Sequence, residues 1–309
     1  MLNQRASHTA ARPKVVYVAG SSYSGSTMLG LVLGADPRAL FVGEPKQIAR
    51  FSGHDSPTGK DRRVCTCGEF SEGCAFWSAV RDLYRSDAVL NPAPGFSLEN
   101  LRLMLRTLSP LRLRWQSRGM TSYASLIEAV SKVAKEEKPG VEFIVDGSKS
   151  IRNLDALACS PCLDVAVVHL VRDCVAVADS FKDRGFSSLY GALAWGVVNA
   201  FLKLYVWRSG IPVLLVSYEA LSRSPEIELA RLNRFLGTTL SVDDVPERVR
   251  REPYHLFAGS RQVRKHIRDF AGIEYQPDRG RLGRFERLAA IGVRRLVDPL
   301  LRVPDPVAR

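Results

Sequence analysis

The segment from Val15 to Leu33 constrains the fold of this chain more than any other. Five apolar residues, 15–19, stop at a glycine- and serine-rich turn that contains Gly20 and Gly25, and a second apolar run begins at Met28. This order predicts a buried β-strand, a phosphate-binding loop and a helix. Such a loop directs backbone N–H groups and a helix N-terminus at one point. The sequence therefore predicts an anionic, phosphate-like ligand.

The loop fits the nucleoside-triphosphate pattern G-x-x-x-x-G-K-[ST] at every position but one. Gly20, Gly25 and Thr27 match, whereas Ser26 stands where the lysine belongs. That lysine reaches the β- and γ-phosphates, so its absence argues against ordinary hydrolysis of ATP or GTP. We favour a related loop with a different anionic ligand; the alternative is a Gly/Ser turn that binds nothing.

Short, almost continuously apolar segments recur along the chain and are separated by segments of helical periodicity. After the first, they cover residues 40–44, 141–145, 165–171 and 213–216. Parallel strands that are buried on both faces have this pattern, so we expect an α/β fold: a parallel β-sheet flanked by helices, of the phosphate-loop nucleotide-binding type. The 309 residues are predicted to form a flexible basic arm, 1–13, and a single domain, 14–309, with a helical or loop insertion around 45–140.

Polar residues follow the predicted strands. Glu44 ends the short apolar segment 40–44. The other four predicted strands lead into the loop that starts at Gly20, residues 146–149, Arg172 with Asp173, and residues 217–219. Ligands of open parallel sheets bind beyond the carboxyl ends of the strands. We therefore expect one crevice to gather these side chains; the alternative is a set of unrelated polar turns.

The chain has a net charge of +12 and a pI near 9.7, which suits anionic partners. The basic segments, 98–115 and the region after Glu252, could contact a membrane surface, and a solvated basic face is the alternative that we favour. Few aromatic residues lie among these charges and no RNA-binding or zinc-finger signature is present, so we expect no nucleic-acid partner. The apolar run 189–207 is interrupted by polar residues and is predicted to be a buried helix rather than a membrane span.

Three of the six cysteines, Cys65, Cys67 and Cys74, lie within ten residues. They could begin a zinc site, but no fourth ligand follows at zinc-site spacing, and His54 lies eleven residues before Cys65. We therefore expect a structural thiol cluster or a single disulfide, and no metal. The length of the chain and its polar N-terminal residues favour a reducing, cytoplasmic setting.

Two signatures resemble the sulfotransferase family that uses 3′-phosphoadenosine 5′-phosphosulfate. Ser24 to Thr27 resembles the loop R-S-G-[ST]-T that holds the 5′-phosphosulfate, with Tyr23 in the place of the usual basic residue. Arg172 and Ser180 reproduce the spacing of the arginine of R-D-P and a later serine, which hold the 3′-phosphate, with Cys174 in the place of the proline. The resemblance implies donor-binding roles for Ser22, Tyr23, Ser24, Gly25, Ser26, Thr27, Arg172, Ser180, Tyr218, Gly259, Ser260 and Arg261.

Further segments extend this resemblance over most of the chain. Gly43-Glu44 is similar to a G-E segment whose glutamate is the implied general base, and residues 146–149 resemble a D-S-S-K turn whose lysine, here Lys149, contacts the transferred sulfate. The blocks 216–221 and 235–237, the segment 65–77 and, more loosely, the loop 259–261 also resemble parts of the family.

The resemblance implies transfer of a sulfuryl group from 3′-phosphoadenosine 5′-phosphosulfate to a hydroxyl acceptor, such as a carbohydrate, a lipid or another small molecule, without a metal. Glu44 is the expected base and Lys149 the expected donor to the sulfate; His54, His169 and Asp146 are the rival bases. One alternative is a kinase or nucleotidase that uses ATP and Mg²⁺, with Asp146 as the metal ligand. Another is a non-catalytic protein that binds an acidic glycan or a membrane through its arginines.

Overall fold

The structure is a computed structural model, and it describes residues 14–48, 64–70, 73–84, 103–105, 107–108 and 118–302. The predicted arm, 1–13, most of the basic segment 98–115 and the candidate base His54 lie outside the described residues.

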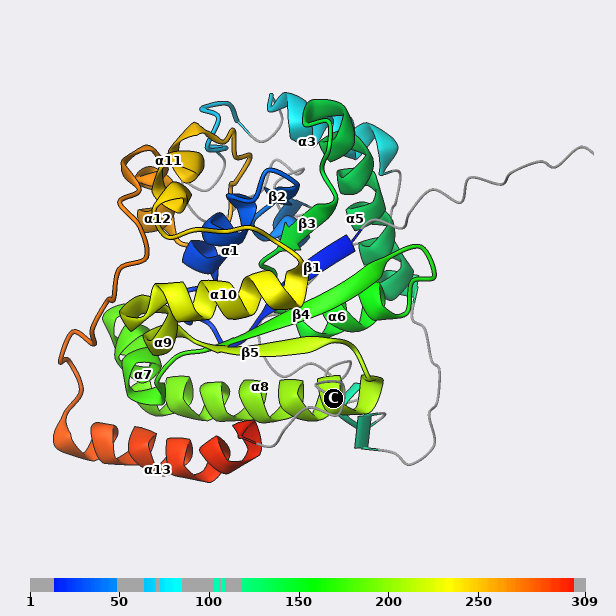
Figure 1. The fold of residues 1–309 in the computed structure, drawn as a ribbon. Helices are drawn as coiled ribbons and strands as arrows, with labels where there is room; N and C mark the ends of the chain where they lie inside the picture. The colour runs from blue at the N-terminus through cyan, green and yellow to red at the C-terminus, as the bar shows by residue number, and fades with distance from the viewer. Residues whose placement is uncertain are drawn as a thin grey trace, which may run out of the picture.

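The centre of the fold is a five-stranded, entirely parallel sheet with the strand order β2-β3-β1-β4-β5 (Figure 1). The strands are β1 (Lys14–Ala19), β2 (Ala39–Phe41), β3 (Phe143–Asp146), β4 (Asp164–Val171) and β5 (Val213–Ser217). The predicted α/β fold with a parallel sheet is thus confirmed, and each strand coincides with one of the predicted apolar runs. β1 is the middle strand, and its side chains from Val15 to Ala19 are at most 2% exposed.

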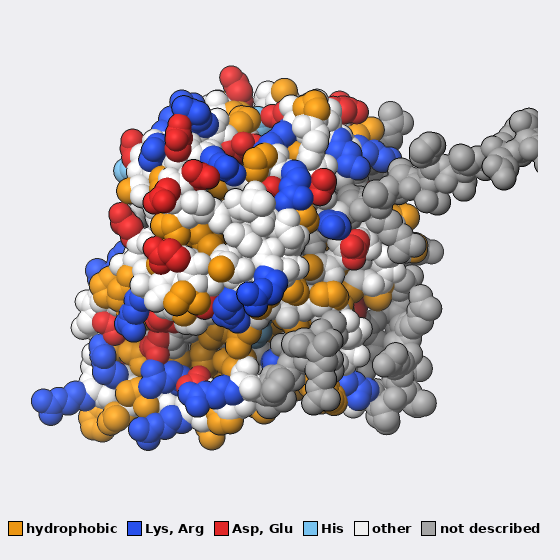
Figure 2. All heavy atoms as spheres, viewed as in Figure 1, with side chains coloured by type: hydrophobic (Ala, Val, Ile, Leu, Met, Phe, Trp, Pro, Cys, Tyr) orange, Lys and Arg blue, Asp and Glu red, His pale blue; other side chains and the backbone are white. Residues whose placement is uncertain are grey.

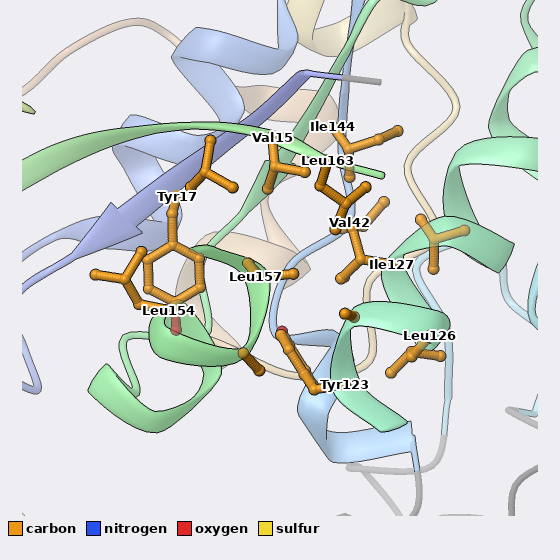
Figure 3. Packing of buried hydrophobic residues seen from close by; sticks show 14 of the residues in the cluster. Val15, Tyr17, Val42, Tyr123, Leu126, Ile127, Ile144, Leu154, Leu157 and Leu163 are labelled. Carbon is orange, nitrogen blue, oxygen red and sulfur yellow. The ribbon is translucent and has the colours of Figure 1, made fainter. Parts of the chain in front are cut away.

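One face of the sheet is covered by α3 (Ala75–Leu83), α5 (Arg118–Glu137), α6 (Ile151–Ala158) and α8 (Ser188–Ser209). Val15 and Tyr17 of β1 point toward this face, where Ile127 of α5 and Leu154 and Leu157 of α6 meet them (Figure 3). Complete burial of an aliphatic side chain of this size contributes about 1.5–3 kcal/mol. The apolar face of α5 therefore packs into the core.

The opposite face is covered by α1 (Ser26–Gly34), α9 (Tyr218–Arg223), α10 (Pro225–Leu236) and α11 (Asp244–Arg251). Val16 and Val18, which alternate with the residues of the first face, pack here. Helix α1 approaches β2 closely at Gly30, where a Cβ atom would lie 2.3 Å from the ring of Phe41. A residue without a side chain is therefore required at this contact.

A third layer is formed by α7 (Cys174–Asp183) and α13 (Arg284–Leu301), which pack against α8 (Figure 1). The predicted helix of the run 189–207 is α8; by length and composition it could cross a membrane, and half of its most apolar window is buried. Figure 2 shows hydrophobic side chains among Lys and Arg over α13. The remaining short helices are η1 (Pro45–Gln47), α12 (Arg261–Lys265) and η3 (Ile267–Asp269).

The close approach of α1 to β2 predicts opposite effects for two glycine substitutions within helices. Gly30→Ala should lower the free energy of unfolding by about 1–3 kcal/mol, because the new methyl group displaces the ring of Phe41. Gly292→Ala in α13 meets no atom within 4 Å and should raise the free energy of unfolding by about 0.5–1 kcal/mol through helix propensity. Urea unfolding of both variants measures the difference, and equal stability of the two variants would contradict the tight contact.

Candidate active site

The loop between β1 and α1 has a backbone that glycine makes possible at two positions. Gly20 has φ 150° and Gly25 has φ 92°. A Cβ atom at Gly20 would lie 2.3 Å from the carbonyl oxygen of Leu170 in β4, and one at Gly25 would lie 2.7 Å from the ring of Tyr218. The loop is therefore seated directly on β4 and on the start of α9, and no larger residue fits either position.

Several polar groups of this loop have no partner among the described residues. The N-cap residue of α1, Gly25, provides no side-chain hydrogen bond to the first N–H groups of the helix. The hydroxyl oxygens of Ser21 and Ser24 are buried and unpaired, while Ser22 is exposed. Buried polar atoms without partners are rare in proteins, and an anion at the positive end of α1 would satisfy them. The loop thus fits the predicted phosphate-like ligand.

Lys149 connects the phosphate loop with the ends of two strands. Its Nζ atom lies 2.9 Å from Oε1 of Glu44, which follows β2, and donates to the hydroxyl of Ser26 at 3.0 Å. Lys149 itself follows β3 and has a left-handed backbone with φ 61°. The phosphate-loop pattern has a lysine at position 26, where this chain has Ser26. Lys149, from the turn after β3, therefore brings an amine to the loop.

Glu44 is ionised at neutral pH. Burial opposes its charge, since its side chain is only 14% exposed, but Lys149 at 2.9 Å and Lys46 at 3.8 Å favour the carboxylate. The net effect of burial and of these two ammonium groups lowers the pKa of Glu44 to about 2. In this arrangement Glu44 is a stable anion rather than a strong base.

Asp146 is buried completely, and both of its oxygens accept hydrogen bonds. Oδ2 accepts from the hydroxyl of Tyr123 at 2.6 Å, and Oδ1 accepts from the backbone N–H of Ser148 at 2.8 Å. Burial raises the pKa of Asp146 to about 6, although these hydrogen bonds act against the shift. The Asp146 side chain therefore fixes the turn that carries Lys149. Because both of its oxygens already accept hydrogen bonds, the structure does not support a role for Asp146 as a base or as a magnesium ligand.

Arg172 holds the other side of the loop. It is 7% exposed, and its guanidinium donates to the carbonyl oxygens of Tyr23 at 3.2 Å and of Gln276 at 2.6 Å. The guanidinium also lies 4.5 Å from the centroid of the Tyr218 ring, and its Nε atom is buried without a partner. The side chain of Tyr23, which replaces a basic residue in the resemblance, packs edge-on against Phe181. Arg172 is thus positioned by the loop and retains one unused donor.

Two of the predicted donor-binding residues have hydrogen-bond partners within the fold. The hydroxyl of Ser180 donates to the carbonyl oxygen of Ala176 at 2.8 Å within α7, and none of its described hydrogen bonds reaches Arg172. Tyr218 is 2% exposed, and its hydroxyl bonds the backbone of Glu274 and Gln276. Tyr218 therefore supports the loop from its buried side instead of presenting its hydroxyl to a ligand.

The loop 259–261, which we call the late loop, contacts the phosphate loop. Gly259 has φ 103°, and the next N–H group, that of Ser260, donates to the hydroxyl of Thr27 at 3.0 Å. Arg261 follows as the first residue of α12 and is exposed. The rival base His169 lies in the core: it is 1% exposed, and its Nε2 atom is hydrogen-bonded to Oδ1 of Asn199 at 2.9 Å.

Sequence reasoning missed three residues that shape this site. Lys46 binds both Glu44 and the carbonyl oxygen of Ser148, and a basic residue two positions after the candidate base was a usable signal. Tyr123 occupies a helical core position and gives no sign of its hydrogen bond to Asp146. Gln276 contributes only backbone atoms, which no side-chain pattern reveals.

Comparison with known proteins gives structural likenesses only. No protein-family model and no curated protein sequence matches the chain. The sulfotransferase domain from the Synechococcus PCC 7002 olefin synthase has a TM-score of 0.46 and 18% identity, over 92% of this chain and 94% of that chain. The sulfotransferase domain from the curacin biosynthetic pathway has a TM-score of 0.46 and 13% identity, over 93% of this chain and 98% of that chain. The sulfotransferase STF9 from Mycobacterium avium has a TM-score of 0.46 and 15% identity, over 95% of this chain and 77% of that chain. At this level of similarity we draw no functional argument from the three structures.

The contact between Glu44 and Lys149 predicts a coupling energy that depends on pH. Lys149→Met should lower the free energy of unfolding by about 1–3 kcal/mol at pH 7, because it leaves Glu44 buried with a weaker partner. Adding Glu44→Gln to this variant should recover part of the lost free energy of unfolding. The single variant Glu44→Gln completes the double-mutant cycle. Thermal unfolding of the four proteins gives the coupling.

The sign of the pH effect follows from the lowered pKa of Glu44. Its folded pKa, about 2, lies below its ordinary value of 4.5, so the pair stabilises the fold fully above pH 4.5. The coupling energy should therefore decline as the pH falls from 4.5 toward 2. A coupling that is absent at pH 7, or that grows on acidification, would contradict the ion pair.

Proposed function

We propose that this protein is a sulfotransferase that moves a sulfuryl group from 3′-phosphoadenosine 5′-phosphosulfate to a hydroxyl acceptor, such as a carbohydrate, a lipid or another small molecule. The observation that carries the proposal is the position of Lys149. Its amine lies between the hydroxyl of Ser26 in the phosphate loop and the carboxylate of Glu44. In sulfuryl transfer, such a cation would stabilise the charge that develops around the transferred group, and the carboxylate could accept the proton of the acceptor hydroxyl.

The polar groups of the site fit both ends of this donor. The loop 22–27, which contains the unpaired hydroxyl of Ser24 and leads into the uncapped helix α1, would hold the 5′-phosphosulfate, with the unpaired hydroxyl of Ser21 directly before it. Arg172, whose Nε atom is buried and unpaired, would hold the 3′-phosphate together with the loop 259–261. The donor supplies an activated sulfuryl group and leaves as 3′-phosphoadenosine 5′-phosphate. We propose that no metal takes part in this step, since Lys149 and the loop N–H groups supply the positive charge.

Glu44 acquires the properties of a base when Lys149 is drawn away from it. In the structure, the ammonium of Lys149 is the main group that favours the charge of Glu44. An anion at the loop competes for that ammonium, and a weakened ion pair raises the pKa of a buried carboxylate. Glu44 would then accept a proton from an acceptor hydroxyl more readily than in the ligand-free arrangement.

We propose that the protein works in the reducing, cytoplasmic setting expected from the sequence. The ATP-dependent alternative gains no support from the site, because the carboxylate of Asp146 is fully buried and both of its oxygens are engaged.

Thermal unfolding with 3′-phosphoadenosine 5′-phosphate, ADP or ATP, each with and without Mg²⁺, tests the donor. At about 100 times its dissociation constant, a ligand that binds only the folded state adds about 2.7 kcal/mol, or a few degrees in a chain of this size. We expect a shift with the 3′-phosphorylated nucleotide alone and without metal. Arg172→Ala should remove this shift, whereas Arg234→Ala, at an exposed position in the last turn of α10, should retain it.

A transfer assay with labelled donor and a panel of hydroxyl acceptors tests the chemistry separately from binding. Lys149→Met should reduce turnover at least 100-fold while the nucleotide still raises the melting temperature, because one transition-state donor is lost. Stabilisation by ATP with Mg²⁺ would instead indicate a kinase or nucleotidase. The absence of any shift would leave the anion-binding surface as the function.

A further inference from the structure

Three cysteines and a histidine meet at one point outside the phosphate loop. Cys65, Cys67, Cys74 and His255 form what we call the cysteine–histidine cluster, and their sulfur and nitrogen atoms all lie within 4.8 Å of one another. Cys65 and Cys74 are buried and Cys67 is exposed. The sequence offered no fourth ligand at zinc-site spacing, and the structure supplies it from a segment far along the chain.

The distances among Cys65, Cys74 and His255 are close to those of a tetrahedral zinc site. The sulfur atoms of Cys65 and Cys74 are 3.7 Å apart, and Nδ1 of His255 lies 3.9 Å from the first and 3.3 Å from the second. Zinc bond lengths of about 2.3 Å to sulfur and about 2.05 Å to nitrogen place tetrahedral ligands about 3.8 Å apart for two sulfurs and about 3.6 Å for sulfur and nitrogen. The sulfurs are too far apart for the single disulfide that the sequence left open, since an S–S bond is about 2.05 Å long.

The backbone around Cys65 and Cys67 is folded into a tight turn. The N–H of Cys65 donates to the carbonyl oxygen of Glu69 at 2.8 Å, and the N–H of Gly68 donates to that of Cys65 at 2.9 Å. Gly68 has φ 97°, a conformation that glycine adopts without strain. The turn is held by its own backbone hydrogen bonds, so the chain itself positions the backbone that carries the two cysteines.

Groups around the cluster orient the imidazole of His255 so that its Nδ1 atom could bind a metal ion. Its other ring nitrogen, Nε2, lies 2.7 Å from Oε1 of Glu137 at the end of α5. Carboxylates in this position fix the tautomer and orientation of metal-binding histidines. Phe76 stacks on the imidazole at 5.1 Å between ring centroids, and Trp77 donates to the backbone oxygen of His255 at 2.7 Å.

We propose that the cysteine–histidine cluster binds one zinc ion as a closed structural site. Three thiolates and one imidazole are the ligands of structural zinc, whereas Mg²⁺ and Ca²⁺ require oxygen ligands. All four coordination positions come from the protein, so no position is left for water or substrate. This proposal replaces the sequence-based expectation of no metal, and it does not depend on the proposed sulfotransferase activity.

The ion would link the segment that carries Cys65, Cys67 and Cys74 to the segment around His255, which leads into the loop 259–261. Thr66 and Leu256 already exchange hydrogen bonds beside the cluster, at 2.9 Å from the N–H of Thr66 to the oxygen of Leu256 and at 2.9 Å from the N–H of Leu256 to the hydroxyl of Thr66. A few residues later, Ser260 contacts Thr27 of the phosphate loop. A zinc ion at this point would stabilise the connection without taking part in the reaction.

Metal analysis of the tag-free full-length chain tests the proposal. The protein is purified with a reductant and without chelator, and zinc is measured by mass spectrometry after exhaustive dialysis. We expect about one zinc per chain. Cys67→Ser removes an exposed thiol with little effect on packing, and zinc should then be released to a chelator at least 10-fold faster; Cys162→Ser, at another exposed cysteine, should behave as the unmodified chain.

Cobalt substitution gives a second readout that depends on the ligands. Co²⁺ in the site should show thiolate-to-cobalt charge-transfer absorption, reduced by about one third in Cys67→Ser, and a chelator should lower the melting temperature of the zinc-loaded chain. Failure of the reduced chain to retain zinc or to take up Zn²⁺ or Co²⁺ would overturn the proposal and leave a hydrogen-bonded thiol cluster. Equal release rates for the two variants, or a bond between Cys65 and Cys74 in the intact mass, would also overturn it.

Discussion

The parallel pairing of β1 with a strand on each side is the constraint on which the site depends. Val15 lies level with Ile144 of β3 and with Val165 of β4, so the carboxyl ends of the three strands reach the same edge of the sheet. A shift of one residue in either pairing would turn every side chain of that strand to the other face. This register places Lys149, after β3, and Arg172, after β4, on the two sides of the phosphate loop.

The pKa values of two carboxyl groups near this edge are shifted in opposite directions by their surroundings. Glu44 lies beside two lysines and its pKa is lowered to about 2, whereas burial raises the pKa of Asp146 to about 6. Neighbouring carboxyl groups whose pKa values are separated in this way take different roles in many enzymes. Here the carboxylate that faces Lys149 is the one that we propose as the base, and the buried one orients the turn that carries the lysine.

The sheet and most of the candidate site could be predicted from the sequence, because buried parallel strands are continuous apolar runs and their ends are marked by polar residues. Glu44, Lys149 and Arg172 were identified in this way. The role of Tyr123 could not be predicted, since a tyrosine at a helical core position looks the same with or without a buried hydrogen bond. His255 was missed as a partner of Cys74 because it lies 181 residues farther along the chain, beyond any spacing rule.

The left-handed backbone of Lys149 restricts how this sequence can change in evolution. A residue other than glycine pays about 1–2 kcal/mol for this conformation, and Lys149 adopts it at φ 61°. Glycine at this position would relieve the strain and would remove the amine that lies between Ser26 and Glu44. Selection for stability and selection for the proposed activity would therefore favour different residues here, and a lineage without that activity would be expected to drift toward glycine or asparagine.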